Sequence, residues 1–309
     1  MNKIFQGDCI EGMRTLPDKS VNCCVTSPPY FGLRDYGHEG QIGLEETPEQ
    51  FVAKLVEVFR EVKRVLKDDG TLWLNLGDSY AGGGGASGHT VETKNLGANT
   101  SNYGAVKSGG KRYGLKQKDL IGIPWMVAFA LRADGWYLRQ DIIWHKPNPM
   151  PESVTDRCTK SHEYIFLLSK SQKYYYDNEA IKQELADPQR TNFQSGSRAN
   201  GDNKDRNDND LAFRSKESIY LNANKRSVWT VTTKPYSEAH FATYPPDLIV
   251  DCIKAGCPEG GIVLDPFMGA GTTAMVARKL NRNYVGCELN PEYIRIAQNR
   301  LQTELGMFA

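Results

Sequence analysis

One segment near the C-terminus constrains the fold more than any other part of the chain. An apolar strand pattern over 261–265 ends in Asp265, a glycine turn follows, and a helix pattern begins directly after it. The turn reads Gly269-x-Gly271-x-x-Ala274, the spacing with which nucleotide-binding folds bring the backbone close to a ligand at a helix N-terminus. The segment therefore predicts an α/β fold that binds a nucleotide-like cofactor.

The residues around this turn narrow the kind of ligand. The strand pattern 284–288 ends in Glu288, whose carboxylate can accept hydrogen bonds from ribose hydroxyls. A nicotinamide-binding domain needs several more strand–helix units after the turn, yet only one more helix pattern, from Pro291 to about Leu305, remains. Asp265 would repel a pyrophosphate, whereas it suits the ammonium and sulfonium of S-adenosylmethionine. A nicotinamide oxidoreductase stays open as an alternative.

A second segment, near the N-terminus, reads Thr26-Ser27-Pro28-Pro29-Tyr30. It follows a buried-strand pattern over 21–25, which the prolines end because proline cannot donate to a strand ladder. Ser27 Oγ and the carbonyl of Pro28 are acceptors that can hold an amino group, and Tyr30 can stack on a flat ring. Taken alone, the segment also fits an ordinary strand-ending turn.

The rest of the chain alternates strand and helix patterns, which favours a mostly parallel sheet with helices on both faces. A helix is predicted from Pro48, with Thr47 as its N-cap and Asp69-Gly70 as its end, and strand 71–76 follows. Ligands of such sheets bind beyond the carboxyl ends of the strands, where the strand order reverses. We therefore expect the serine-proline turn and the glycine turn to meet at adjacent strand ends.

Composition excludes several classes of protein. The net charge is +1, so any contact with nucleic acid depends on locally clustered basic residues. The seven cysteines have no C-x-x-C spacing and the histidines have no metal-ligand spacing, which predicts reduced thiols and no metal. The start of the chain does not fit a signal peptide, and no apolar run reaches the roughly 18 residues of a membrane span. We expect a cytoplasmic protein without a membrane partner.

On these motifs the chain resembles the β group of DNA amino-methyltransferases. The run Asp265–Thr273 is similar to their S-adenosylmethionine motif, and Thr26–Tyr30 is similar to their catalytic motif in the form typical of cytosine-N4 enzymes. The order, catalytic motif first and cofactor motif last, is that of the β group. Residues 7–9, 144–148, 162–164 and 240–248 also fit the family pattern.

The resemblance implies a Rossmann-like class I methyltransferase fold. Its seven-stranded, mostly parallel sheet is circularly permuted, so the chain begins at the third strand of the cofactor half, and a small target-recognition insert is added. The expected parts are a catalytic half over 1–177 with a mobile loop at 81–114, a target-recognition region over 178–230, and a cofactor half over 231–309.

The motifs and the resemblance together name the site residues. The catalytic group is Ser27, Pro28, Pro29 and Tyr30. The group expected to bind S-adenosylmethionine is Asp8, Thr26, Phe241, Asp265, Phe267, Gly269, Gly271, Thr272, Thr273 and Glu288.

Two polar stretches, 107–118 and 183–227, supply the expected DNA contacts. Basic residues that can neutralise phosphates are Lys107, Lys111, Arg112, Lys116, Arg190, Arg198, Arg214 and Arg226. The second stretch, 183–227, also fits a solvated, flexible insert, because its aspartates nearly cancel the local positive charge.

The predicted activity is methyl transfer from S-adenosylmethionine to the exocyclic amino group of a base flipped out of double-stranded DNA. Ser27 favours cytosine N4 over adenine N6. The same residues also fit a catalytically inactive DNA-binding protein, or an enzyme acting on RNA or on a protein amide. The host is expected to be a bacterial, archaeal or phage-infected cell. The sequence decides neither the oligomeric state nor whether a cognate restriction endonuclease exists.

Overall fold

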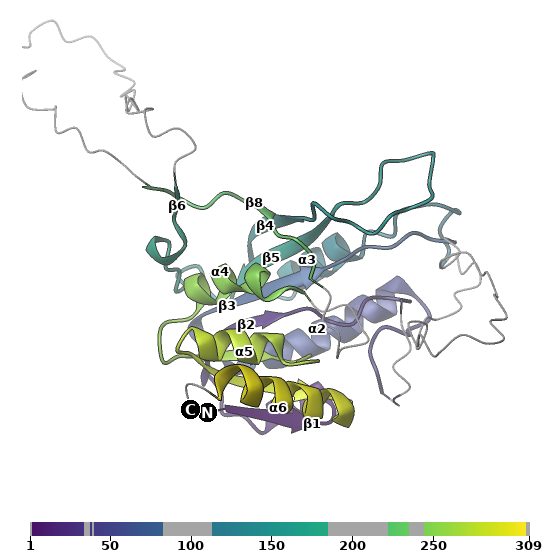
Figure 1. Cartoon of the computed structure of the whole chain (residues 1–309). Helices are drawn as coiled ribbons and strands as arrows, with labels where there is room; N and C mark the ends of the chain where they lie inside the picture. The colour runs from purple at the N-terminus through teal and green to yellow at the C-terminus, as the bar shows by residue number, and fades with distance from the viewer. Residues whose placement is uncertain are drawn as a thin grey trace, which may run out of the picture. The chain divides into compact units, whose positions relative to one another are not determined.

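One large sheet forms the centre of the computed structural model (Figure 1). The structure describes residues 2–33, 38, 40–82, 113–184, 222–234 and 244–306. Within these ranges eight strands pair in the order β1-β10-β9-β2-β3-β5-β4-β8. In chain order they are β1 (Asn2–Gln6), β2 (Val21–Thr26), β3 (Leu66–Leu76), β4 (Tyr137–His145), β5 (His162–Ser169), β8 (Val228–Thr230), β9 (Ile262–Asp265) and β10 (Asn283–Glu288). All neighbouring strands are parallel except that β5 runs antiparallel to both β3 and β4.

Helices cover both faces of this sheet (Figure 1). In chain order they are α1 (Cys9–Arg14), α2 (Pro48–Val65), α3 (Ile123–Ala133), α4 (Pro246–Gly256), α5 (Thr272–Lys279) and α6 (Pro291–Leu305). The helices α1, α2 and α3 pack together on one face, and α4, α5 and α6 pack together on the other. The apolar side of α2 supplies much of the core, and its Phe51, Leu55 and Phe59 are fully buried.

The strand order reverses between β9 and β2, at the centre of the sheet. From β9 the chain passes through α5 to β10 on one side, and from β2 it passes through α2 to β3 on the other side, across the opposite face. The connections that leave the carboxyl ends of β9 and β2 therefore run in opposite directions, which makes this a topological switch point, the place where open α/β sheets bind ligands.

The observed strand order confirms the expected permuted fold. The first strand of the chain, β1, pairs with β10, which in turn pairs with β9, so the chain begins at the third strand of the cofactor half. The seven expected strands are present, and the short β8 is added as an eighth beside β4. The three residues of β8 directly follow the polar stretch 183–227 and pair with residues 143–145 of β4.

One predicted helix boundary was wrong. Thr47 caps α2 as expected, since its Oγ1 accepts a hydrogen bond from Gln50 N at 3.2 Å. However, α2 ends at Val65 rather than at Asp69-Gly70, because Leu66 already has extended backbone angles and pairs with Val21 of β2. Burial of Leu66 in this pairing outweighs the local turn signal.

Residues 178–225 separate as a second compact unit. Its described part contains the short 3-10 helix η1 (Glu179–Ile181) and a small sheet of β6 (Gln183–Glu184) and β7 (Asn222–Ala223). The expected recognition region, 178–230, stays a prediction. In the described part of the chain no helix is long and apolar enough to cross a bilayer.

Candidate active site

The described residues of the two motifs lie at the carboxyl ends of neighbouring strands. β2 pairs with β9 through Cys23–Val263 and Cys24–Leu264, and this register sets the end of β2 beside Asp265. On the other side of β9, Glu288 ends β10, and Gly7 N after β1 donates to its carbonyl at 2.9 Å. The expectation that the serine-proline turn and the glycine turn meet at adjacent strand ends is thus confirmed.

A buried carboxylate joins the two motifs. Asp265 is only 2% exposed, and its Oδ1 accepts from Thr26 Oγ1 at 2.6 Å and from Phe267 N at 3.0 Å. Its Oδ2 accepts from Thr273 Oγ1 at 2.5 Å and from Tyr244 Oη at 3.2 Å. Tyr244 and Thr273 are also in hydrogen-bond contact with each other. Three hydroxyls and one backbone N–H therefore surround a single side chain.

Burial and hydrogen bonding oppose each other at this carboxylate. Burial raises the pKa of Asp265, while the donors from Thr26, Thr273, Phe267 and Tyr244 act to lower it. The pKa of Tyr244 is also raised, by burial and by the nearby Asp265. A buried carboxylate is tolerated because its lone pairs are used by donors, and removing one donor leaves part of the desolvation cost uncompensated.

The glycine turn has the shape of a ligand cradle. Gly269 and Gly271 have φ of +51° and +78°, and a Cβ on Gly271 would lie 2.7 Å from Ala297 Cβ of α6. No side chain caps the N-terminus of α5, so its first N–H groups can serve an anionic group. Beneath the turn, buried Arg300 donates to Thr272 Oγ1 at 2.9 Å and to Ala270 O at 3.4 Å.

Glu288 fixes the turn from the neighbouring strand. Its Oε2 accepts from Gly269 N at 2.8 Å and its Oε1 accepts from Asn290 N at 2.9 Å. Burial raises the pKa of Glu288, although the N–H donors of Asn290 and Gly269 act in the other direction. Each carboxylate oxygen has one further lone pair, so the side chain can still accept from a ligand hydroxyl.

The serine-proline turn presents two acceptors. Ser27 is half-buried, and within the described chain no hydrogen bond engages Ser27 Oγ or the carbonyl of Pro28. Tyr30, also half-buried, donates from its hydroxyl to Glu163 Oε2 at 2.7 Å. Its ring lies against Gly77, where a Cβ would come within 2.6 Å of Tyr30 Cε2. The turn can therefore hold a planar amine beside an aromatic ring.

Several residues predicted to bind the cofactor have side chains that are bonded within the protein. The side chains of Thr26, Asp265, Thr272 and Thr273 are buried and bonded to protein groups. Direct contact between these side chains and a ligand stays a prediction.

The remaining cofactor residues differ in their surroundings. Exposed Asp8 caps α1 by accepting from Ile10 N and Glu11 N through the same oxygen, Oδ1. Phe267 is half-buried beside the glycine turn. Phe241 lies outside the described residues.

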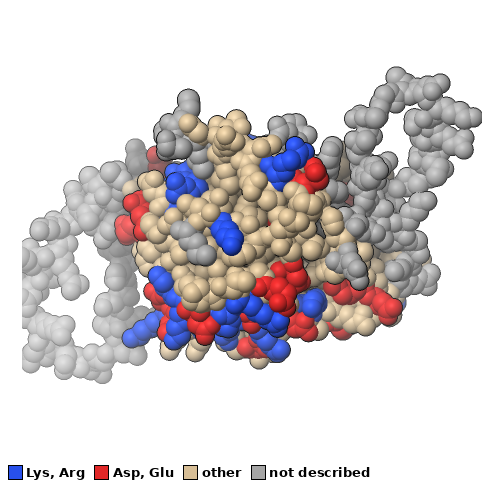
Figure 2. Space-filling view, turned by 90° about the horizontal axis from the view of Figure 1, so that it is seen from below, with Lys and Arg blue, Asp and Glu red and all other residues tan. Residues whose placement is uncertain are grey.

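The expected DNA contacts are mostly untested by the structure. Lys107, Lys111, Arg112, Arg190, Arg198 and Arg214 lie outside the described residues. Lys116 and Arg226 are described and exposed. On the face drawn in Figure 2, the described acidic and basic side chains are interleaved and form no purely basic patch.

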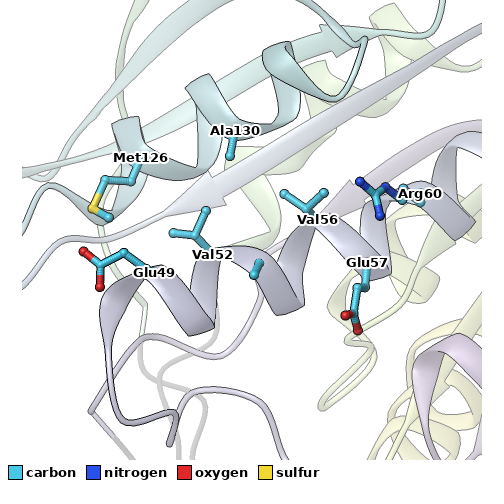
Figure 3. Close-up of a pocket in the computed structure, with 8 residues that line it drawn as sticks. Glu49, Val52, Val56, Glu57, Arg60, Met126 and Ala130 are labelled. Carbon is cyan, nitrogen blue, oxygen red and sulfur yellow. The ribbon is translucent and has the colours of Figure 1, made fainter.

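A hollow of about 550 Å³ lies away from these motifs, between α2 and α3 (Figure 3). Val52, Val56, Met126 and Ala130 form its apolar part, while Glu49, Glu57 and Arg60 stand at its rim. None of the predicted site residues lines it. Among the described residues no cluster of His, Cys, Asp and Glu could hold a metal ion.

Three functional candidates were missed by the sequence argument. Tyr244 lies within 240–248 and Glu163 within 162–164, two segments that fit the family pattern, but the pattern gave neither side chain a role. Arg300 lies in the last predicted helix, where a basic residue is most often solvated. Only packing reveals that these side chains reach Asp265, Tyr30 and the glycine turn, respectively.

The chain is similar to known methyltransferases. Residues 21–299 match the family model described as DNA methylase. The Type II methyltransferase M.Cfr9I of Citrobacter freundii is 50% identical over 301 residues, which cover 97% of this chain and 88% of the relative. The Type II methyltransferase M.SmaI of Serratia marcescens is 48% identical over 299 residues, which cover 97% of this chain and 90% of the relative.

Solved structures share the fold. The PvuII DNA methyltransferase (cytosine-N4-specific) superposes with a TM-score of 0.63 at 17% identity, over 97% of this chain and 86% of that one. A protein from Thermus thermophilus, solved in complex with S-adenosyl-L-methionine, superposes with a TM-score of 0.61 at 24% identity, over 100% of this chain and 96% of that one.

The bond between Thr26 and Asp265 gives a first testable prediction. Thr26→Val removes one donor from a buried carboxylate, so we expect the free energy of unfolding to fall by about 1–3 kcal/mol. Urea denaturation measures this loss. Thr26→Ser keeps the hydroxyl and should cost less; equal losses in the two variants would contradict the assignment.

The pH dependence of this loss has a definite sign. The pKa of Asp265 is raised in the folded state, so its ionisation lowers stability as the pH rises from the ordinary aspartate range through the raised pKa. Without the Thr26 donor the ionised form is held less well. Loss of this donor raises the pKa of Asp265 further, so the difference in stability between Thr26→Val and the unmodified protein should start to grow near the folded pKa of the unmodified protein and level off above the higher pKa of the variant.

Proposed function

The chain belongs to the DNA methylase family, and we propose that, with S-adenosylmethionine as methyl donor, it methylates the N4 amino group of a cytosine flipped out of double-stranded DNA. Membership of this family means that the chain transfers a methyl group to DNA and is not a nicotinamide oxidoreductase. The choice of base and the roles of single residues are our inference.

The juxtaposition of β2 and β9 is the observation that supports these roles best. The register of these strands and the bond between Thr26 and Asp265 hold Ser27 and Pro28 next to the glycine turn. Methyl transfer needs an amine acceptor and a methyl donor at fixed separation and angle, and rigid neighbouring strands can supply both.

The cradle fits S-adenosylmethionine by the chemistry of its groups. The uncapped N-terminus of α5 offers N–H donors to a carboxylate, and Glu288 offers carboxylate oxygens to ribose hydroxyls. Gly269 and Gly271 let the backbone approach closely, and Phe267 beside the turn offers an apolar surface. When bound, the cofactor supplies a methyl group made electrophilic by its sulfonium.

The chain's own residues prepare the amine. The lone pair of an exocyclic amine is delocalised into the ring, and acceptors on its N–H groups increase the electron density on nitrogen. Ser27 Oγ and the Pro28 carbonyl act as these acceptors, and Pro28-Pro29 keeps them from moving. Tyr30 stacks on the extruded base. No covalent bond between protein and base is required.

Ser27 is the basis for choosing cytosine. The resemblance associates Ser at this position with cytosine N4, and Asp or Asn with adenine N6. The PvuII enzyme carries cytosine-N4 specificity in its name, but at 17% identity that likeness supports the fold alone.

The two polar stretches are the proposed DNA-binding segments. We assign phosphate contacts to the basic residues of 107–116 and target recognition to 178–230. The Type II designation of the relatives supports a restriction–modification role, in which a cognate restriction endonuclease shares the recognition sequence. The enzyme would then work beside its DNA in the cytoplasm.

Nucleoside analysis tests the activity and the base together. Purified protein and radiolabelled S-adenosylmethionine are incubated separately with DNA, RNA and protein, and methylated DNA is digested to nucleosides. We expect label in DNA as N4-methylcytosine. N6-methyladenine without N4-methylcytosine would overturn the choice of base, and the absence of label in DNA would indicate an inactive DNA-binding protein.

Ser27→Ala tests the role of the turn. Losing one amine acceptor should lower kcat about 100-fold while the affinity for S-adenosylmethionine is unchanged. Ser20→Ala is a matched control, because Ser20 precedes the opposite end of β2 and donates to Pro17 O. Equal kcat values for the two variants would remove Ser27 from the mechanism.

Glu288 predicts how cofactor affinity depends on pH. Ribose hydroxyls donate to the ionised carboxylate, so binding favours ionisation and releases a proton below the raised pKa of Glu288. Affinity measured by calorimetry should increase as the pH rises through that pKa and then level off. Glu288→Gln should flatten the profile; an unchanged profile in this variant would exclude the ribose contact.

Deletion of 185–225 tests target recognition. The variant should keep affinity for S-adenosylmethionine, because the glycine turn and Glu288 belong to the other compact unit. It should lose sequence-selective methylation, as read by methylation-aware sequencing of a host that expresses it. Retained selectivity would move recognition elsewhere in the chain.

A further inference from the structure

A second carboxylate, that of Glu163, lies beside the serine-proline turn, where β3 and β4 end and β5 begins. Glu163, near the start of β5, accepts from Tyr30 Oη at 2.7 Å and from Asn75 Nδ2 at 3.2 Å through Oε2. Its other oxygen, Oε1, forms an ion pair with Lys146, directly after β4. Because β5 is antiparallel to β3 and β4, its beginning lies at the edge where those strands end.

Glu163 is itself held firmly. Asn75 is 4% exposed and also donates to the carbonyl of Tyr164 at 3.1 Å, so its amide is fixed between two strands. The side chains of Lys146 and Glu163 are 18% and 13% exposed, and Lys146 Nζ lies 4.2 Å from the ring centre of Trp144. Three donors from three different segments therefore fix the carboxylate in one position.

Tyr30 is held at two points as a result. Its ring edge rests on Gly77, where even a Cβ would come within 2.6 Å, and its hydroxyl is bonded to Glu163. The ring contact alone permits the ring to tilt about its bonds, whereas a second anchor at the hydroxyl fixes the ring plane. Tyr30 follows two prolines, so the orientation of the ring is linked to the acceptors on Ser27 and Pro28.

We propose that Glu163 is a positioning residue for methyl transfer: it acts through the Tyr30 hydroxyl to set the ring plane on which the target base stacks. This inference rests on the proposed function, in which Tyr30 contacts the extruded base. A small tilt of that ring would turn the amino group away from the line of attack, and misplacements of about 1 Å can cost about 100-fold in rate.

A double-mutant cycle tests the coupling. Tyr30→Phe keeps the ring and removes the hydroxyl, and Glu163→Ala removes the acceptor. We expect each variant to lower kcat about 10-fold with the KM for S-adenosylmethionine unchanged, and the double variant to lower it no further, since both changes break the same bond. Independent losses, about 100-fold in the double variant, would overturn the proposal.

Two further variants separate positioning from charge balance. Lys146→Met removes the cation but leaves the bond between Tyr30 and Glu163, so kcat should fall less than about 3-fold. A 10-fold loss in Lys146→Met would mean that Glu163 serves Lys146 rather than Tyr30. Glu152→Ala is the matched control, because Glu152 also pairs with a cation, Arg157, in the connection between β4 and β5. Its kcat should be unchanged.

Folding and the proposed function are checked in the same series. Urea denaturation identifies a destabilised Glu163→Ala; Glu163→Gln then replaces it, since its amide oxygen still accepts from Tyr30 and should retain more activity than Tyr30→Phe. A Glu163→Gln variant with less activity than Tyr30→Phe would overturn the proposal. Tyr30→Ala distinguishes the two levels. Full activity in Tyr30→Ala removes the stacking role and with it the proposed function of Tyr30. Inactivity of Tyr30→Ala with normal kcat in Glu163→Ala removes only the positioning role.

Discussion

The hydrogen bond between Thr26 and Asp265 is the interaction on which the arrangement of the site depends. Asp265 could not remain buried without donors, and the donors come from three distant parts of the chain: the end of β2, the start of α5 and Tyr244 before α4. The hydrogen bonds to this one carboxylate therefore fix the relative positions of β2, the glycine turn and the segment before α4. If these segments moved apart, the buried carboxylate would lose its donors, and an unpaired buried charge costs free energy. The desolvation penalty of Asp265 therefore constrains the geometry of the site.

The serine-proline turn lies between two such carboxylates. Thr26, just before the turn, is bonded to Asp265, and Tyr30, at its end, is bonded to Glu163. The prolines restrict the backbone between these anchors. The acceptors of Ser27 and Pro28 thus have neighbours fixed on both sides, while their own oxygens have no hydrogen-bond partner in the described structure. Acceptors that are held rigidly and have no partner in the protein are preorganised to accept hydrogen bonds from a ligand.

The sequence predicted those features that depend on local backbone chemistry. Glycine spacing located the cofactor turn, two prolines located the end of β2, and a Thr-Pro pair located the start of α2. The adjacency of the two motifs also followed, since alternating strands and helices leave few arrangements of a parallel sheet. The end of α2 did not, because pairing of Leu66 with Val21 overrides the Asp-Gly signal.

Side-chain partners could not be read from the same pattern. Asp265 was interpreted as a carboxylate that suits a cationic ligand. Its position at a strand end is visible in the sequence, whereas the protein donors that surround it are not. Glu163 and Arg300 present the same difficulty, since their roles come from contacts with Tyr30 and Ala270 on other elements.

The permuted strand order has a consequence for the synthesis of the protein. Of the eight strands of the sheet, β1 is made before all the others and its partner β10 after all the others, and β9 must insert between β10 and β2. Until β9 and β10 are made, β1 has no partner strand in the sheet and the serine-proline turn lacks its buried carboxylate. The sheet is therefore complete only after β10 has been made, and a chain that stops before β9 lacks both Asp265 and the glycine turn.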